Sequence, residues 1–515
     1  MDDCLHIIKK QTLDITFDSE EKAFSLQNEI LDIYNERIIP ELDMICNEMC
    51  DNGTIVKIDK LELNIGEISL GNINNEFVDK VTTAFKKELT QALEDSKQPD
   101  DINVQITDVS GSKLALLEHF IYTGTLPWWA SRYGDIDLEK IFKELLIESG
   151  DEVEDILSRG MNTENFRKRL AYQFSQDIII PIIEISNPGH GKYIDIITDE
   201  LLLIISAIKG IDTKEITRPL LMFHVLSYPD INKTEFNKMD FVVFLLKNIA
   251  GKLNIHLMEI INMGKPAVEK LNFKGNIFTT SLPGIFNDLQ NQIFITGETQ
   301  KDANATDPKT ESKKKTQIEE EYILSETKFT KLQQDLKTNV EVPGKRKIAI
   351  EEHYINNAGL VLLWPYLANF FENLKLSERN NFISKEHKYR AVHLLQYLVC
   401  GKQNQAEHFL ILNKMLCELD LHEPVPLITE LTENEIKACD DLLAAVIKNW
   451  SVLKNTSING LRESFLKRNG KLSKESDKWL LRVERKSYDL LLDKLPWGIS
   501  IVRLQWMKTL IFVEW

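Results

Sequence analysis

The chain has 515 residues, a length that a single hydrophobic core rarely serves, so we expect two to four domains. Its 43% hydrophobic and 27% charged residues are typical of folded globular proteins. The 62 basic and 79 acidic residues give a net charge of −17. This balance argues against a general binder of nucleic acid or of anionic membrane surfaces, because both need clustered cations.

The cysteine count and the N-terminal sequence bear on the compartment. Six cysteines are too few for a disulfide scaffold in a chain of this length, so we expect reduced thiols. The first residues show no basic leader followed by an apolar core, which predicts no signal peptide. The longest apolar runs fall far short of the roughly 20 residues that span a bilayer. The sequence therefore predicts a cytoplasmic protein without a membrane span.

Residues 1–95 are predicted to form a βαβα N-terminal domain. Alternation of apolar and polar residues indicates strands, and apolar residues on one helical face indicate helices. The predicted elements are a strand at 13–17, a helix from 18 to Pro40, a strand at 61–65 and a helix at 76–93. Val56 and Ile58 have the opposite parity to the second strand, which suggests a bulge near Asp59.

A polar linker is predicted at 96–112, followed by a helical domain at 113–296. Its first apolar stripe, from Leu114 to Ile121, stops at Gly124. The run Ile178–Pro181 fits either a buried strand or a helix. Residues 297–347 are rich in Lys, Thr, Asp and Asn and have few large apolar residues, so we expect a flexible polar linker.

Residues 348–515 are predicted to form a helical C-terminal domain with terminal strands. Helical stripes follow at 360–371, 392–399, 442–450, 461–466 and 479–492. Two strand-like runs, 498–504 and 510–515, close the chain, and they are candidates for sharing a sheet with the N-terminal strands. A chain end this apolar is expected to be packed against something. The fold class is therefore α+β and mainly helical.

The candidate metal and nucleophile patterns are weak. Cys46 and Cys50 share a helical face, but no nearby Cys or His pair completes the four ligands of structural zinc. His387, His393 and His408 have no ligand spacing with each other or with the cysteines near them. These residues are interpreted as core or surface side chains.

The phosphate-loop and catalytic motifs are incomplete. Asn187–Lys192 has glycines and a lysine, but Tyr193 stands where a P-loop needs Ser or Thr. Ser464–Lys467 and Ser325–Lys328 fit Ser-x-x-Lys without the companion motifs, and no Gly-x-Ser-x-Gly occurs. The sequence thus predicts no catalytic, cofactor-binding or metal residues, and a protein that is not an enzyme.

A basic strip runs from Arg462 to Lys486. It holds nine basic residues against four acidic ones in an otherwise acidic chain. One interpretation is a solvated helix face, and the other is a docking surface for an acidic protein, since charge complementarity steers association. The sequence leaves both open.

The tryptophans are the strongest candidates for contact with partners. Six of the eight lie beyond residue 360, and Trp is enriched at protein interfaces. Neighbouring tryptophans at 128 and 129 cannot both face one core from a regular element. The candidate partner-docking residues are Trp128, Trp129, Trp497, Trp506 and Trp515.

Several stretches, in their order and spacing, resemble the tape-measure family of contractile injection systems. They are His6–Gln11, Ile58–Glu67, Thr123–Ala130 (Thr-Gly-Thr-Leu-Pro-Trp-Trp-Ala), Asn357–Tyr366, His393–Gly401 and Leu495–Trp515. The resemblance covers roughly 1–130 and 348–515, is weaker over 131–296 and is absent from 297–347.

The resemblance implies a structural role in a phage-tail-like bacterial particle, in which a contractile sheath surrounds a rigid tube. Such a protein would be cytoplasmic during assembly and would then lie in the tube lumen, in several copies, and set the tail length. The implied partners are the inner tube protein, the baseplate hub or spike and the tube-terminating cap protein, with no nucleic acid and no cofactor.

A literal ruler conflicts with the predicted compact units. A fully helical chain of this length would span roughly 770 Å, whereas the 297–347 linker alone would add only about 77 Å. Two other hypotheses remain: an assembly chaperone or adaptor that is not retained in the finished tube, and an enzyme or toxin cargo. The latter would need a constellation of acid, base or nucleophile.

Overall fold

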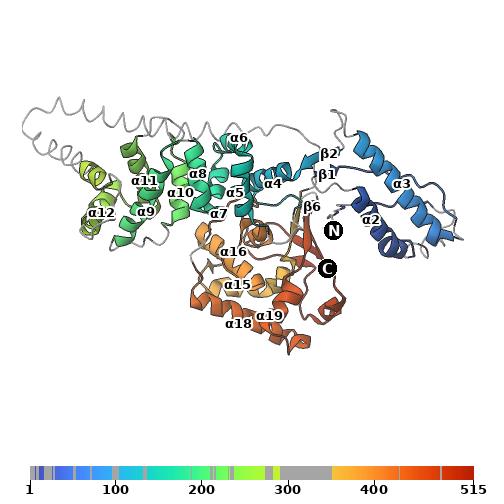
Figure 1. Ribbon diagram of the computed structural model, residues 1–515. Coiled ribbons are helices and arrows are strands. Elements are labelled where there is room, and N and C mark those ends of the chain that lie inside the picture. Colours follow the sequence, from blue (N-terminus) through green and yellow to red (C-terminus); the bar gives the residue numbers. More distant parts are fainter. Residues whose placement is uncertain are drawn as a thin grey trace, which may run out of the picture. The chain divides into compact units, whose positions relative to one another are not determined.

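A computed structural model describes the chain in sections (Figure 1). The described residues are 29–49, 54–69, 72–95, 104–130, 136–186, 188–208, 216–229, 237–272, 282–289, 351–427, 430–475 and 478–515, with 11–16 and the single residues 6, 8, 26, 213 and 231. They fall into two compact units. The first comprises 1–117, 128–134 and 144–149, and the second comprises 118–127, 135–143 and 150–515. The predicted linker at 297–347 lies outside the described residues.

The N-terminal unit consists of helices and a two-stranded antiparallel sheet. Its elements are η1 (Tyr34–Ile38), α2 (Ile39–Met49), β1 (Thr54–Ile58), α3 (Ile73–Asp95) and β2 (Val104–Asp108), and α4 (Val109–Thr123) follows directly. Apolar faces of η1, α2 and α3 form one core, which includes Ile38, Phe77 and Val81. The helix predicted at 76–93 is confirmed by α3.

Four local predictions in this unit were wrong. Residues 61–65 form no strand, and the strand lies instead at β1, on the parity of Val56 and Ile58. The polar linker expected at 96–112 contains β2, because Val104 and Ile106 pair with β1 in register. Residues 11–16 form no strand. Pro40 does not end the helix, because the helical run continues through 29–49 and widens to the π-turn η1 just before Pro40.

Helices dominate the middle of the chain, where α7 to α12 lie side by side (Figure 1). They are α5 (Leu138–Glu148), α6 (Gly150–Gly160), α7 (Glu164–Gln173), α8 (Gln176–Ser186), α9 (Gly191–Ala207), α10 (Arg218–Leu226), α11 (Lys238–Leu253) and α12 (Leu257–Asn272). The ambiguous run Ile178–Pro181 is part of α8, which carries Pro181 inside the helix. Gly124 adopts φ +75° directly after α4, as the sequence predicted for the end of that helix.

The C-terminal part combines helices with a five-stranded sheet. Its helices are η4 (Ala358–Leu363), α15 (Trp364–Asn373), α16 (Lys385–Cys400), η5 (Glu407–Leu410), α17 (Ile411–Leu416), α18 (Glu433–Asn449), η6 (Ser451–Leu453), α19 (Ile458–Leu461), η7 (Arg462–Leu466) and η8 (Ser487–Lys494). Its strands are β3 (Glu352–Ile355), β4 (Ser377–Glu378), β5 (Asn381–Phe382), β6 (Gly470–Glu475), β7 (Lys478–Val483), β8 (Ile501–Val502) and β9 (Ile511–Glu514).

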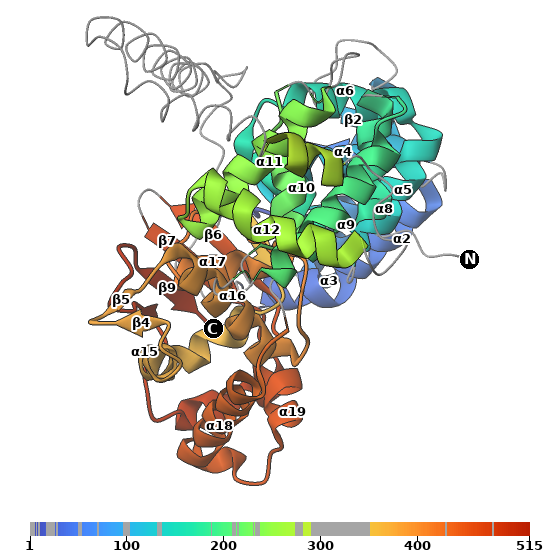
Figure 2. The ribbon, with the colours of Figure 1, turned by 90° about the vertical axis from the view of Figure 1, so that its left-hand side faces the viewer.

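The main sheet has the order β3-β6-β7-β9-β8, in which only the β7–β9 pair is parallel. Figure 2 shows β6, β7 and β9 together on one side of this part, with α18 and α19 at its far end. Alternate residues of the strands, among them Leu472, Leu481 and Ile511, are fully buried. The sheet thus covers one face of a core built by η4, α16 and α17.

The predicted α+β fold with a closing strand pair is confirmed, because β8 and β9 pair antiparallel. The N-terminal strands do not join this sheet, since β1 pairs with β2. The helix predicted at 479–492 was also wrong. Trp479, Leu481 and Val483 are buried at alternate positions of β7, and η8 follows as a short 3-10 helix.

The backbones of η4 and η7 pack so closely that only glycine fits at position 359. A Cβ atom on Gly359 would lie 1.7 Å from the carbonyl oxygen of Phe465 and 2.7 Å from Cα of Leu466. Backbone atoms cannot move aside as the end of a flexible side chain can. Gly359 therefore sets the approach of η4 to η7.

We expect Gly359→Ala to lower the free energy of unfolding by roughly 3 kcal/mol, near the upper end of ordinary overpacking costs. The matched control is Gly498→Ala, because a Cβ at Gly498 meets no atom within 4 Å. The control should stay within about 0.5 kcal/mol of the wild type in urea unfolding. Equal stabilities of the two variants would contradict this account.

Candidate functional site

The aromatic tail, residues 495–515, packs onto its own C-terminal part. The indole N–H of Trp497 donates to the carbonyl of Leu362 at 3.0 Å, and that of Trp506 donates to the carbonyl of Leu416 at 2.8 Å. In return, the indole of Trp364 donates to Gly498 at 2.9 Å. These paired bonds tie the tail to η4, α15 and α17.

The last residue is held by Arg468, a fully buried cation. Its guanidinium donates to both carboxylate oxygens of Asp489, at 2.5 and 3.1 Å, and stacks on the rings of Tyr488 and Trp515. The indole of Trp515 also donates to Asp489 at 3.0 Å, and its carbonyl accepts from Arg485. Contact with Arg468 helps to hold the pKa of Asp489 below its usual value against the effect of burial. The expected packing of the chain end is thus found within one molecule.

The other tryptophan pair lies in the first compact unit. Trp128 and Trp129 are both half-buried in a turn after α4, so neither sits on a regular element. The ammonium of Lys57, on β1, lies 4.2 Å from the centre of the Trp129 ring.

The basic strip is not a helix face. It contains η7 and the β6–β7 hairpin, and six of its nine cations pair with carboxylates. The pairs, at 2.5–3.7 Å, are Arg462–Asp440, Lys467–Glu463, Arg468–Asp489, Lys471–Glu352, Lys474–Glu351 and Arg482–Glu514. Acidic residues from other elements thus neutralise most of the strip, which favours the structural interpretation over an acidic partner.

A buried charge centre joins the helices to the C-terminal part within the second unit. It consists of Arg169 on α7, Glu407 at the start of η5 and Lys414 on α17, all with fully buried side chains. Arg169 donates to both carboxylate oxygens of Glu407, at 3.0 and 3.3 Å, and Lys414 donates to the same carboxylate at 2.6 Å. Burial lowers the pKa of Lys414, and Glu407 opposes that shift.

Backbone carbonyls complete the charge centre. Arg169 also donates to Ile121 and His422, both at 2.6 Å, and Lys414 donates to Leu421 at 2.9 Å. Two cations beside one carboxylate are thus surrounded by carbonyl oxygens, which bear partial negative charge. A buried ion pair keeps its geometry only when such hydrogen bonds satisfy its remaining donors.

The residues around the charge centre leave space for its side chains. A Cβ atom on Gly124 would lie 2.3 Å from a Glu407 oxygen and 2.9 Å from Nε of Arg169, and φ +75° also favours glycine there. Gln173 accepts from the Glu407 backbone at 2.9 Å and donates to Val425 at 3.0 Å. The end of α4 and the end of α7 therefore both fit against η5.

A second buried network lies inside the C-terminal part. The side-chain amide of Asn357 donates to Gln396, Asn413 and the carbonyl of Phe409, at 2.8–3.1 Å. The amide of Asn413 donates to Val392 at 2.9 Å. All three amide side chains are buried. This network fixes η4 against α16 and α17 in one register.

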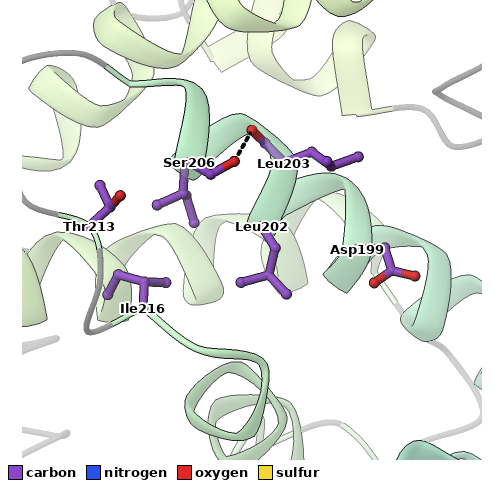
Figure 3. Close-up of a pocket in the computed structure, with 7 residues that line it drawn as sticks. Asp199, Leu202, Leu203, Ser206, Thr213 and Ile216 are labelled. Carbon is purple, nitrogen blue, oxygen red and sulfur yellow. Dashed lines mark hydrogen bonds between the residues drawn. The ribbon is translucent and has the colours of Figure 1, made fainter. Parts of the chain in front are cut away.

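A pocket of about 460 Å³ lies beside α9 (Figure 3). It is lined by Asp199, Leu202, Leu203, Ile205, Ser206, Thr213 and Ile216. Asp199 pairs with Arg218, and the hydroxyl of Ser206 donates to the Leu203 carbonyl at 2.9 Å, so neither is poised to act on a ligand. The pocket brings no nucleophile and base together.

The patterns weighed in the sequence also lack chemistry in the described part of the chain. Among those residues, no group of three or more His, Cys, Asp or Glu side chains could hold a metal ion. Burial raises the pKa of the Cys46 and Cys400 thiols, so their nucleophilic thiolate forms are disfavoured. Of the described helices, none alone is long and apolar enough to cross a bilayer, although the bent pair Lys238–Leu253 and Leu257–Glu269 meets the criteria of length and composition together.

Comparison with protein families gives one match, to the contractile injection system tape measure protein family, over residues 5–515. The chain belongs to this family. Searches of curated proteins and of solved structures gave no match. The resemblance carried by the motifs is therefore confirmed, and the match extends through the middle of the chain, where the motifs were weak.

Three of the family-like stretches meet in one core of the C-terminal part. Asn357–Tyr366 supplies Asn357, Gly359 and Trp364, and His393–Gly401 supplies Gln396. The tail bonds to the first stretch through Trp497. The order and spacing of these stretches thus specify a packing arrangement.

Sequence reasoning missed the charge centre. Arg169 and Glu407 are 238 positions apart, and neither has a local motif that marks it. The available signals were Gly124 at the end of an apolar stripe and a lysine at 414 within an apolar run.

We expect Glu407→Gln to lower the free energy of unfolding by about 3–5 kcal/mol, since it leaves two buried cations without their carboxylate. The control Glu463→Gln removes a partner of Lys467 at the surface. It should change the free energy of unfolding by less than about 1 kcal/mol. Chemical unfolding followed by circular dichroism measures both. Similar small losses in the two variants would show that the centre contributes little.

Proposed function

We propose that this protein acts without catalysis as a structural component in the assembly of a contractile injection system and takes part in determining tail length. The observation that carries the proposal is the family match over residues 5–515. The described residues support it, because the family-like stretches build cores and no acid, base and nucleophile converge there. The expected partners are the inner tube protein, the baseplate hub or spike and the tube-terminating cap protein.

Length control is assigned to residues 297–347, which lie outside the described residues. Helices α7 to α12 pack on one another, so their residues span far less than an extended chain would. A segment that measures must instead contribute length in proportion to its residues. We infer that 297–347 contributes this length, and that the helical part before it and the C-terminal part after it separate in the tube lumen and act as docking ends.

We expect duplication of residues 319–336 to lengthen the particle by about 27 Å if the added segment is helical, or by roughly 60 Å if it is extended. Deletion of the same residues should shorten it equally. Electron microscopy of negatively stained particles measures sheath length. A control chain with these residues in shuffled order should give the wild-type length, and unchanged length in the duplication and the deletion would reject the proposal.

Retention in the particle distinguishes a tape measure from an assembly chaperone. We expect mass spectrometry of purified uncontracted particles to find this chain in a constant ratio to the tube protein, in several copies per particle. Its absence from finished particles, with presence in assembly intermediates, would favour the chaperone.

A further inference from the structure

One buried histidine next to the charge centre has no hydrogen-bond partner. His408 is 6% exposed, and neither of its ring nitrogens lies within bonding distance of another described group. Buried polar atoms are usually paired, so an imidazole without a partner needs a reason. The ring is held by aromatic packing instead, edge-to-face on Phe120 at 6.1 Å and 81°, and beside Phe409 at 4.0 Å.

His408 lies where α4 meets η5. Phe120, on α4, is fully buried between His408 and Phe174. Glu407, which directly precedes His408 in the chain, supplies the carboxylate of the charge centre. The His408 side chain is therefore part of the same contact between helices and C-terminal part that Arg169 and Lys414 hold together.

The charged and titratable groups around this contact offer little compensation for a further positive charge. They are His119 on α4, Arg169 on α7, His353 on β3, Glu407 on η5, Lys414 on α17, and His422 and Glu423 after α17. Glu407 is already shared by two cations, and Glu351 lies 3.4 Å from His353. Both ring nitrogens of His408 lack an acceptor among the described residues, so a proton on the ring would add a cation that none of their carboxylates pairs with.

We propose that protonation of His408 opens the contact between α4, α7 and η5, so that the helical part separates from the C-terminal part while the C-terminal sheet stays folded. The orphaned ring nitrogens and the aromatic packing of the buried ring at this contact carry the proposal. A neutral imidazole can pack here as an aromatic ring. An imidazolium has two N–H donors and a positive charge, and it finds no acceptor or counter-charge among the described residues.

The direction of the pH dependence follows from burial. Burial lowers the pKa of His408 from 6.5 to about 4, so the folded contact binds fewer protons than the opened one. The contact is therefore most stable above pH 6.5 and weakens as the pH falls towards 4. Burial lowers the pKa of His119 to about 4 as well, and that of His353 in the same direction, so both add to the same trend.

Amide hydrogen exchange of the full chain tests the proposal, with His408→Phe and His408→Gln as variants that stay neutral at every pH. Between pH 7.5 and pH 5, exchange in α7 and η5 of the wild type should accelerate about 30-fold relative to either variant, as the shift from 6.5 to about 4 requires. Comparison at equal pH cancels the intrinsic exchange rates. Protection in β6, β7 and β9 should not change.

The matched control is His256→Gln, which alters an exposed histidine and should keep the wild-type response. If one His408 variant fails to fold, the other still decides the question. The same acceleration in the wild type and in a folded His408 variant would overturn the proposal. Equal acceleration of α7 and the sheet strands would also overturn it, because the whole unit would then unfold together.

Discussion

The buried contact among Arg169, Glu407 and Lys414 decides how the second compact unit is built. Removing three charges from water is expensive, and the cost is offset only when each donor and acceptor finds a partner. Here the carboxylate accepts three hydrogen bonds, and the two cations donate to three further backbone carbonyls. Such an arrangement tolerates one geometry, so α7 and η5 meet in a single register although 238 positions separate them.

While this contact is formed, the second compact unit cannot also be an extended chain. A chain that measures length by threading a tube must be extended, whereas the charge centre and the stacked helices hold the described residues of the second compact unit together. Opening that unit would leave two cations and a carboxylate without partners until water reached them. The folded residues are therefore better suited to anchoring than to measuring, which agrees with the proposal that 297–347 contributes the length.

The polar groups of the tail also find their hydrogen-bond partners inside the molecule. Its indole groups donate to backbone carbonyls of η4 and α17 and to Asp489, so the polar atom of each of these rings is used inside the molecule. Trp506 is only 9% exposed and packs on Phe371 and Phe382. The tail closes its own domain, and any partner contact would use the ring faces that remain half-exposed at Trp497 and Trp515.

Local patterns predicted the elements whose signals are local. The stripe ending at Gly124, the helix ending at Gly401 and the closing strands were all readable, because a glycine cap or an alternation fixes each without help from distant residues. The segment from Trp479 was misread, since its alternating burial depends on pairing with β6 and β9.

The β2 segment was taken as a linker for a similar reason, because only its register with β1 makes five residues of mixed polarity a strand. The charge centre could not be predicted at all. Its members are ordinary charged residues in ordinary helices until the fold brings them together. The candidate site lay in tertiary contacts that no spacing records.

Whether the helical and C-terminal parts form one unit is tested most directly by native-state hydrogen exchange in low denaturant at pH 7.5. The account predicts that the slowest amides of α7 and of η5 open with the same free energy and the same denaturant dependence, as members of one cooperative unit do. Opening of α7 at a distinctly lower free energy, with η5 still protected, would show that the charge centre does not unite the two parts.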